Sequence, residues 1–406
     1  MSSEQTHVIV GAGMTGAKAA ETLRAEGFDG RIVLIGAEQE RPYDRPPLSK
    51  GYLLGDQDRD SVYLHPMGWY GDNHVELLTG RRVSRLNREA HEVELAGGER
   101  IGYTKLLLAT GSSPRRLKVD GNELGGVHYL RRLEQSEDLR ASFAHGGKVV
   151  VVGGGWIGLE TAAAARKAGC EVTVVEPMAT PLHAALGPEM GAFFGDVHRR
   201  QGVDLRLGVG VTGFKGAGKV SAVATDAGDI PADVVVVGVG ARPNTELAED
   251  AGLAMDNGGV LVDSALRTED PDIFAAGDIA SVPNSRYGRR IRVEHWQNAV
   301  DSGPAAARAM LGQDVVYDQL PYFFTDQYDL GMEFAGWFEP GGYDRVVTRG
   351  DVDGSAFYAF WLAGDQVVAG MHVNQWDGGI GPVQELIRSR RAVDADRLAD
   401  LGAPIA

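Results

Sequence analysis

The sequence predicts an α/β protein with two doubly wound, Rossmann-type domains followed by a small α+β domain. One pattern occurs twice, over residues 7–36 and 148–176: an apolar strand, a glycine-rich loop, a helix of small residues, a glycine and a second apolar strand. The strands are almost continuous runs of Val, Ile and Leu, which is typical of parallel sheets buried on both faces. After about Gln319 the pattern changes to short alternating runs separated by glycine-containing turns, which indicates antiparallel strands.

Each repeat divides into the same elements. The expected elements are the helices 17–26 and 159–168, the glycines Gly27 and Gly169 that follow them, and the strands 31–35 and 171–175. A glycine just past a helix suits the left-handed conformation in which many helices end.

The rest of the chain supplies further strands and one more helix. We expect buried strands in 103–111 and 232–240, a crossing linker over 112–118, a short strand with a glycine turn and a helix start over 272–278, an antiparallel meander over 332–337, 343–348, 356–362 and 366–373, and a final helix over about 382–391.

Composition and charge exclude several classes of function. The chain has 40 basic and 56 acidic residues, so a net charge of −16 argues against general affinity for nucleic acid or anionic membranes. Its single cysteine, Cys170, excludes an intramolecular disulfide framework and a four-cysteine metal site, and no other metal site is expected. We find no signal peptide and no apolar run near the ~20 residues of a membrane span. We therefore expect a cytoplasmic protein.

The glycine-rich loops predict two dinucleotide sites. In a G-x-G-x-x-G loop, the first glycine allows a tight turn, the second lets the backbone approach a pyrophosphate, and the third allows close helix–strand contact. The N-terminus of the helix then offers free N–H groups to the phosphates. A single loop of this kind could merely join a strand to a helix, but two in the same context indicate two cofactors. The glycines concerned are Gly11, Gly13 and Gly16 in the first loop and Gly153, Gly155 and Gly158 in the second.

Each repeat has an acidic residue at or shortly after the end of its second strand. Glu176 ends the second strand of the second repeat, where its carboxylate would accept both ribose hydroxyls of NADH and repel the 2′-phosphate of NADPH. Residues 177–181 contain no arginine for that phosphate, so the sequence favours NADH, with an ordinary solvated acid as the alternative. In the first repeat the nearest acid, Glu38, comes two positions late, and its assignment to a ribose is open.

Several longer motifs carry a resemblance to a known family. They are RPYDRPPLSKGY at 41–52, ATG at 109–111, LR at 130–131, GGGWIGLE at 153–160, AAGD at 275–278, EHWQNA at 294–299 and PYFFTDQYD at 321–329. Together they closely resemble the ferredoxin reductases of oxygenase and cytochrome P450 systems, of the putidaredoxin reductase type and distantly like apoptosis-inducing factor. The glycine loops and the Gly-Asp motif are shared more widely with glutathione-reductase-like flavoproteins.

The resemblance implies two cofactors, a partner and a domain plan. FAD would bind a discontinuous domain of residues 1–112 and 243–319, NADH would bind residues 113–242, and residues 320–406 would form an interface domain. The implied activity is transfer of a hydride from NADH to FAD, followed by single electrons to an iron–sulfur ferredoxin. No nucleic-acid or membrane partner is expected, and the oligomeric state, monomer or homodimer, is open.

The resemblance also implies three catalytic residues, Lys50, Glu160 and Glu294. Lys50 would lie beside the flavin, where a cation stabilises the negative charge of the reduced ring. Glu160 would pair with Lys50 and, with Glu294, face the nicotinamide; an acid favoured only by the helix dipole is the alternative for Glu160.

The remaining implied positions bind the cofactors. Asp278 would hold the ribityl hydroxyls or, alternatively, cap a helix. Trp296 would lie at the flavin edge or in the core, and His295 beside it is more structural than catalytic, because hydride transfer needs no general base. The other positions are Met14, Arg45, Val83, Ala109, Thr110, Gly111, Arg131, Ile157, Gly240 and Gly277.

Rival functions differ in what they need. A disulfide reductase or peroxidase needs a redox cysteine against the flavin, and 41–52 contains none. An NADH-sensing interaction module and an NADH oxidase with another acceptor stay open. Phe324 stands where the family usually has Trp, which bears on electron exit to the partner. A basic patch for ferredoxin, or else an ordinary charge cluster, is formed by Arg286, Arg289, Arg290, Arg292 and Arg308.

Overall fold

The computed structural model describes residues 5–405, which divide into two compact units. The first unit comprises the described residues up to Asp44, with Asp60–Ser113 and Arg242–Pro321. The second comprises Arg45–Arg59, Pro114–Ala241 and the described residues from Tyr322 onward. The domain boundaries expected from the sequence stay a prediction.

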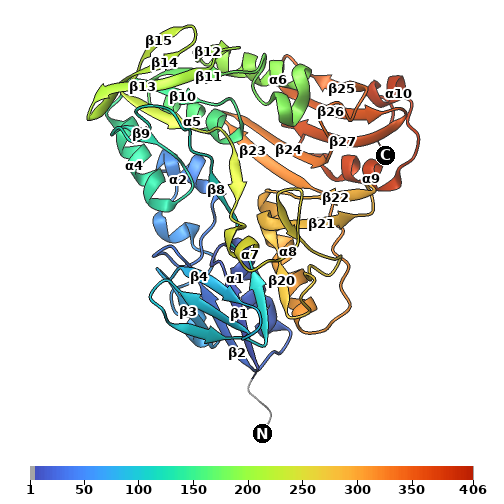
Figure 1. Cartoon of the computed structure of the whole chain (residues 1–406). Coiled ribbons are helices and arrows are strands. Elements are labelled where there is room, and N and C mark those ends of the chain that lie inside the picture. The colour runs from blue at the N-terminus through green and yellow to red at the C-terminus, as the bar shows by residue number, and fades with distance from the viewer. Residues whose placement is uncertain (1–4, 406) are drawn as a thin grey trace. The chain divides into compact units, whose positions relative to one another are not determined.

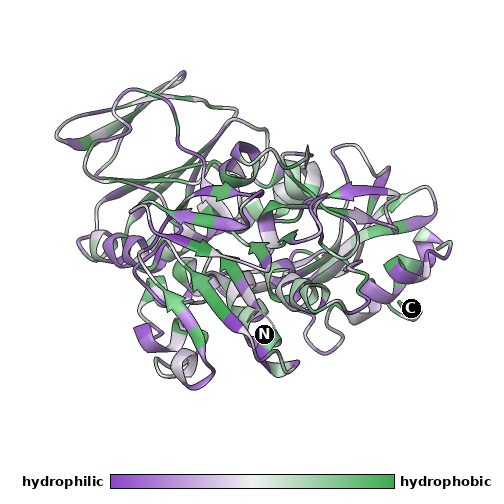
Figure 2. Cartoon of the chain, turned by 60° about the horizontal axis from the view of Figure 1, so that its bottom comes forward, coloured by the Kyte–Doolittle hydropathy of each residue, from purple (hydrophilic) through white to green (hydrophobic). Residues whose placement is uncertain are grey.

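A five-stranded parallel sheet forms the centre of the first unit (Figure 1). Its strands are, in order across the sheet, β20 (Ile273–Ala275), β7 (Lys105–Leu108), β1 (Thr6–Val10), β2 (Arg31–Ile35) and β3 (Val75–Leu78). Val8 on the central strand pairs with Val33 on one side and Leu106 on the other. All of these strands except the edge strand β3 are almost fully buried, and Figure 2 shows mainly apolar ribbon in the strands beside the N-terminus.

Two helices pack closely together in this unit. Helix α1 (Met14–Ala25) contacts α8 (Trp296–Met310) along much of its length. The approach depends on Gly303, because a Cβ there would lie 2.4 Å from the Thr15 carbonyl oxygen. The other elements around this core are α3 (Trp69–Asp72), β4 (Val83–Asn87), β5 (Glu92–Leu95), β6 (Arg100–Gly102), α7 (Glu246–Asp250), β18 (Met255–Asp256), β19 (Gly259–Leu261), η3 (Gly277–Ile279), β21 (Ala280–Asn284) and β22 (Arg289–Ile291).

The second unit repeats the parallel architecture. Its sheet has the order β12 (Asp204–Leu207), β11 (Glu171–Glu176), β10 (Lys148–Val152), β16 (Val234–Val237) and β9 (Val127–His128). Helices α4 (Leu133–Ala144), α5 (Trp156–Lys167) and α6 (His183–Arg200) belong to the same unit, as do η1 (Pro46–Ser49), α2 (Gly51–Leu54) and the antiparallel strands β13 (Val211–Ala217), β14 (Lys219–Thr225) and β15 (Gly228–Pro231). Three short elements lie at the unit boundaries: η2 (Arg59–Val62), β8 (Ser112–Pro114) and β17 (Ala241–Pro243).

The C-terminal part of the second unit is an antiparallel sheet with two short helices. Its strand order is β23 (Tyr322–Gln327), β24 (Leu330–Gly336), β27 (Gln366–Val373), β26 (Ala356–Ala363) and β25 (Arg345–Asp351), followed in the chain by α9 (Gly381–Ser389) and α10 (Ala395–Ala399). The simple meander expected from the sequence is therefore wrong in one respect, because β24 pairs with β27 and not with β25.

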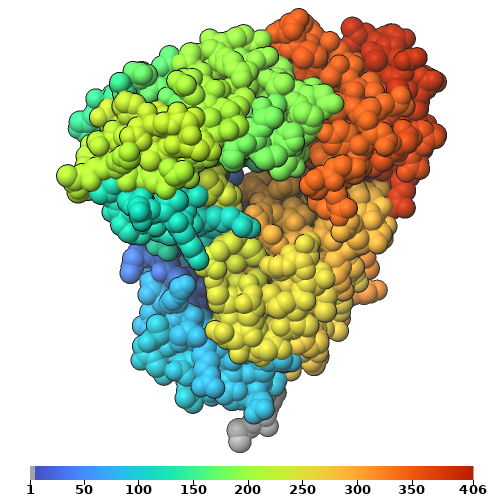
Figure 3. All heavy atoms as spheres, turned by 45° about the horizontal axis from the view of Figure 1, so that its top comes forward, coloured from blue at the N-terminus to red at the C-terminus, as the bar shows by residue number. Residues whose placement is uncertain are grey.

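The antiparallel sheet packs on helix α6 of its own unit. Rings of Phe193 and Phe357 meet edge to face at 4.9 Å, and the Trp361 indole N–H donates to the Leu186 carbonyl at 3.0 Å. Figure 3 shows the green surface around α6 lying directly against the orange-red surface of this sheet. The sheet is thus anchored through an aromatic core.

The predicted fold class is confirmed, with two further local corrections. Gly27 and Gly169 have φ of +83° and +84°, as expected for glycines that end helices. Helices α1 and α5 begin earlier than predicted, directly after the second glycine of each loop, because those glycines are themselves the N-cap residues. The predicted helix start near Asp278 is a single 3-10 turn that leads into a strand. No helix among the described residues is long and apolar enough to cross a membrane.

Candidate active site

The first glycine loop has one position that the fold leaves open. A Cβ at Gly11, whose φ is +120°, would lie 2.0 Å from the Ala109 carbonyl oxygen, and one at Gly16 would lie 2.0 Å from that of Gly11. A Cβ at Gly13 would meet nothing within 4 Å. Packing therefore requires the first and third glycines, whereas the second faces open space.

The second glycine loop repeats this division. A Cβ at Gly153 would lie 2.4 Å from the Gly238 carbonyl oxygen, and one at Gly158 would lie 2.0 Å from that of Gly153. At Gly155 the nearest atom would be 3.8 Å away, which is ordinary contact. Gly13 and Gly155 cap 12-residue helices without any side-chain cap, so first-turn N–H groups stay available to an anion. Both loops therefore fit a diphosphate.

Glu176 is held in place at the end of β11. Its Oε2 accepts the Gly154 N–H at 2.6 Å and its Oε1 accepts the Met178 N–H at 2.9 Å. Each carboxylate oxygen can accept a further hydrogen bond, so the fixed group is ready for ribose hydroxyls. Ile157, a predicted cofactor-binding residue, lies in the same unit, and its side chain is exposed, as is that of Met178.

The acid of the first repeat has a different setting. Glu38 follows β2, and its Oε2 accepts the Tyr43 hydroxyl at 2.6 Å. Val83 opens β4 in the same unit and is half-buried. The ribose assignment of Glu38 and the cofactor contact of Val83 stay predictions.

A buried polar cluster surrounds Asp278. Its Oδ2 accepts the Ser112 hydroxyl at 2.6 Å, and the N–H of the preceding Gly277 donates to Ser302 Oγ at 3.0 Å. Asp278 lies inside the 3-10 turn, whose N-cap is Ala276, so the alternative that it caps a helix is wrong.

The Ala109–Thr110–Gly111 motif is tied to Asn244. The Thr110 hydroxyl donates to the backbone carbonyl of Asn244 at 2.6 Å, and the side-chain amide of Asn244 donates to the backbone carbonyl of Thr110 at 2.9 Å. The backbone N–H of Asn244 donates to the backbone carbonyl of Gly111. Sequence reasoning missed Ser112 and Asn244, although both lie beside motifs that it used.

The start of α8 presents the Glu-His-Trp motif. The Trp296 indole N–H donates to Asp44 Oδ1 at 2.6 Å, and the half-buried ring is not part of the core. Glu294 forms an ion pair with Arg292. His295 is the N-cap residue, and burial lowers its pKa to about 4, against the opposing effect of Asp278. Asp44, in the RPYD motif, is a further residue that sequence reasoning missed.

Lys50 and the buried Glu160 form an ion pair. The ammonium lies 2.8 Å from Glu160 Oε1, and the carboxylate also accepts the hydroxyls of Ser49 at 2.5 Å and Thr325 at 2.6 Å. Glu160 is 4% exposed and is the fifth residue of α5, outside its first turn. The alternative, that the helix dipole alone favours an acid at this position, is therefore wrong. The Phe324 ring lies 5.5 Å from the ammonium.

Two further predicted residues meet in the second unit. Arg45 Nη1 donates to the Arg131 carbonyl at 2.6 Å, and the Arg131 N–H donates to Gln135 at 2.9 Å. Gly240 has φ of +95° and accepts a bond from the Arg115 N–H. The predicted FAD residues thus divide between the units, since Lys50, Arg45 and Arg131 belong to the second and the first glycine loop belongs to the first.

Comparison with known proteins identifies the family. Residues 5–303 match the family model described as pyridine nucleotide-disulphide oxidoreductase, and residues 322–406 match the reductase C-terminal domain. The chain is 44% identical to rhodocoxin reductase of Rhodococcus erythropolis, covering 91% of this chain and 86% of that one. It is 42% identical to the ferredoxin–NAD(+) reductase component of the anthranilate 1,2-dioxygenase system of Burkholderia cepacia, covering 98% of each. The chain belongs to the pyridine nucleotide-disulphide oxidoreductase family.

A solved structure agrees with this membership. The putidaredoxin reductase in its covalent complex with putidaredoxin superposes with a TM-score of 0.95 at 36% identity, covering 99% of this chain and 97% of that one. The resemblance to ferredoxin reductases is confirmed, and the chain is an oxidoreductase that depends on FAD and NAD(H). The two glycine loops fit these two cofactors.

The disulphide chemistry in the family's description does not apply to this member. Cys170 is the only cysteine of the chain, is fully buried, and donates its S–H to the Phe143 carbonyl at 3.5 Å. Burial raises the pKa of its thiol, which disfavours the reactive thiolate.

Three arginines of the expected basic patch have hydrogen-bond or ion-pair partners within the first unit. Arg290 donates to the carbonyls of Val262 and Ser281, at 2.6 and 3.0 Å. Arg292 pairs with Glu294, and Arg308 pairs with Glu26 at 2.9 Å. These contacts favour the alternative of an ordinary charge cluster for three of the five arginines.

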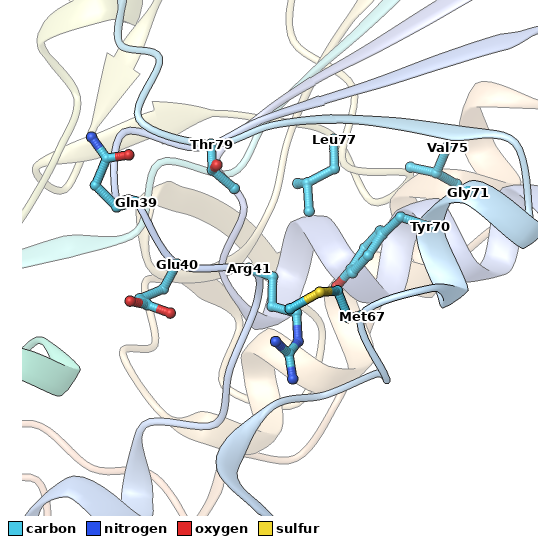
Figure 4. Close-up of a pocket in the computed structure, with 9 residues that line it drawn as sticks. All are labelled: Gln39, Glu40, Arg41, Met67, Tyr70, Gly71, Val75, Leu77 and Thr79. Carbon is cyan, nitrogen blue, oxygen red and sulfur yellow. The ribbon is translucent and has the colours of Figure 1, made fainter. Parts of the chain in front are cut away.

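A cavity of about 450 Å³ lies in the first unit, and none of the residues that line it is a predicted site residue, although the lining residue Gln39 directly follows Glu38 in the chain (Figure 4). Its charged side chains already have partners: Glu40 accepts the Tyr63 hydroxyl at 2.5 Å, while Arg41 stacks on the Tyr63 ring and donates to the His65 carbonyl at 3.2 Å. The buried Tyr70 hydroxyl is sealed from solvent.

Proposed function

We propose that the chain is an NADH-dependent ferredoxin reductase, which passes electrons from NADH through FAD to an iron–sulfur ferredoxin of an oxygenase or P450 system. The observation that carries the proposal is the Lys50–Glu160 pair in a chain with two diphosphate loops and no second cysteine. A flavin with no dithiol beside it must pass its electrons directly to an external acceptor. The relatives described as ferredoxin–NAD(+) reductase components support this acceptor.

Bound FAD would supply a two-electron acceptor that can release electrons singly. Lys50 would stabilise the negative charge that reduction places on the flavin, and Glu160 would fix the position of that ammonium. Glu176 would accept the ribose hydroxyls of NADH, and Glu294 would face the nicotinamide. Asp278, Arg45, Arg131 and Trp296 would hold FAD.

The domain plan belongs to the same proposal. Residues 1–112 and 243–319 would bind FAD, residues 113–242 would bind NADH, and residues 320–406 would form the partner interface. The low cysteine content favours a reducing compartment, and we propose the cytoplasm. Fractionation of the source cells would check the compartment, and light scattering of the purified protein would decide between monomer and homodimer.

An anaerobic titration tests the proposal first. We expect the purified, FAD-loaded protein to show a flavin spectrum that bleaches with NADH and far less readily with NADPH. Absence of a flavin band after reconstitution would refute the cofactor assignment, whereas a preference for NADPH would refute only the role of Glu176.

Turnover then separates the proposal from its alternatives. With a [2Fe–2S] ferredoxin and cytochrome c as the final acceptor, we expect fast NADH-driven reduction that depends on the ferredoxin. A long-lived charge-transfer complex without acceptor activity would instead favour an interaction module. Rapid oxygen consumption without ferredoxin would favour an NADH oxidase.

A further inference from the structure

We propose that Thr325 and Gln327 are positioning residues for the Lys50–Glu160 pair, at the start of a hydrogen-bond chain that ends on helix α6. The inference rests on the proposed function, in which Lys50 acts on the flavin. Strand β23 of the C-terminal sheet carries both residues, and every member of the chain lies in the second unit.

The first link is at Glu160. Its Oε1 receives the ammonium of Lys50 at 2.8 Å and the hydroxyl of Thr325 at 2.6 Å. Glu160 is 4% exposed and Thr325 is 1% exposed, so water cannot readily replace a lost partner. Without the Thr325 hydroxyl, Oε1 would keep only the Lys50 ammonium as a partner, and the carboxylate would lose the donor that fixes this side of it.

The following links continue inward from the same hydroxyl. The Gln327 amide nitrogen donates to Thr325 Oγ1 at 3.3 Å, and Gln327 Oε1 lies 2.8 Å from His198 Nε2. The Tyr328 hydroxyl lies 3.1 Å from the other ring nitrogen of His198. Gln327 and His198 are 1% and 0% exposed, so the links from Thr325 to His198 are buried, whereas Tyr328 is half-buried.

One assignment of hydrogens satisfies the whole chain. Thr325 gives its only hydroxyl hydrogen to Glu160, so towards Gln327 it must accept. The Gln327 carbonyl then faces His198, which carries its hydrogen on Nε2 and accepts from Tyr328 on Nδ1. Burial lowers the pKa of His198 to about 4, so the neutral ring that this arrangement requires is kept at neutral pH.

The consequence concerns Lys50, whose stem is long and flexible. Its ammonium is placed by the Glu160 carboxylate, and that carboxylate is fixed from two sides, by Ser49 on Oε2 and by Thr325 on Oε1. Strand β23 therefore sets the position of a charge on a segment far away in sequence. Removing the Thr325 hydroxyl should displace the ammonium while leaving Lys50 and Glu160 themselves unchanged.

The test uses the FAD-loaded protein with Thr325→Val, which keeps the shape and removes the hydroxyl. We expect flavin reduction by NADH in stopped flow to slow about tenfold, as for loss of a hydrogen bond to a charged group. We also expect the flavin midpoint potential to become more negative, because a displaced cation stabilises the reduced ring less. Thr325→Ser should restore both values. Thr348→Val, on β25 of the same sheet, is the matched control and should change neither.

A second variant keeps the inference testable if Thr325→Val folds poorly. Gln327→Met should slow reduction by about threefold, and the Thr325→Val/Gln327→Met double variant should be no slower than Thr325→Val alone, because both act through one chain. Independent, multiplying losses would overturn the inference, and so would a Thr325→Val protein with the wild-type rate and potential. If NADH fails to reduce the wild-type flavin at all, it is the proposed function that fails.

Discussion

Replacing Gly155 by alanine should weaken NADH binding and leave the fold intact. The residue has φ of −79°, which any amino acid adopts, and an added Cβ would come no closer than 3.8 Å to the protein. The methyl group would instead occupy the space in which a diphosphate approaches the backbone. Losing one or two charge-assisted hydrogen bonds, each contributing about 1.5–3 kcal/mol, corresponds to a 10- to 100-fold or greater rise in Kd.

The assay is the NADH-concentration dependence of flavin reduction in stopped flow, with thermal unfolding measured alongside. Gly13→Ala is the matched control for the other loop and should weaken FAD binding instead. Gly158→Ala should behave differently from both, because its Cβ would lie 2.0 Å from the Gly153 carbonyl oxygen and must disturb packing. Unchanged NADH affinity in a well-folded Gly155→Ala protein would show that the diphosphate does not lie over this glycine.

Three further predictions concern recognition and stability. Glu176→Ala should raise the KM for NADH about tenfold and reduce the preference over NADPH, as steady-state kinetics with both coenzymes will show; an unaltered preference would place the ribose elsewhere. His7 and His198 have pKa values lowered by burial to about 4, so the unfolded chain binds protons below pH 6.5 that the fold cannot. The free energy of unfolding should then fall between pH 6.5 and 4, by up to about 1.4 kcal/mol per pH unit for each histidine, and urea titrations should show a smaller fall in His7→Phe. Arg349 donates to four backbone carbonyls between Leu398 and Ala403, so Arg349→Ala should abolish amide protection in this tail while the central sheets keep theirs in hydrogen exchange.

The two nucleotide-binding repeats could be predicted because their signals are local. Each glycine loop, helix and closing glycine lies within about thirty consecutive residues, and the conformation at Gly27 and Gly169 follows from backbone sterics alone. Strand order in the C-terminal sheet is not local. Nothing in the residues of β24 says that β27, rather than β25, is its neighbour, so the shorter connection was the wrong expectation.

The same distinction separates the site residues that were found from those that were missed. Lys50 and Glu160 were predicted from a family resemblance, and the structure brings them within 2.8 Å. Their supporting partners lie within quoted motifs, but the sequence does not show that they meet Glu160, because Ser49 lies 111 residues from it and Thr325 lies 165 residues from it. A serine in a 3-10 turn or a threonine on a strand is an ordinary residue until tertiary packing places its hydroxyl beside a buried charge.

The two central glutamates show how hydrogen-bond partners suit a carboxylate to its task. Glu176 is fixed by two backbone N–H groups, which are neutral and leave its negative charge uncompensated for hydroxyl recognition and for repulsion of a phosphate. Glu160 has two neutral hydroxyl donors and one cation, and its charge is compensated by Lys50. Within this pair, the attraction between the two charges offsets part of the desolvation cost of each. Exchanging the two settings would defeat both tasks: a cation beside Glu176 would attract the phosphate that it should repel, and Glu160 without Lys50 would leave a buried negative charge.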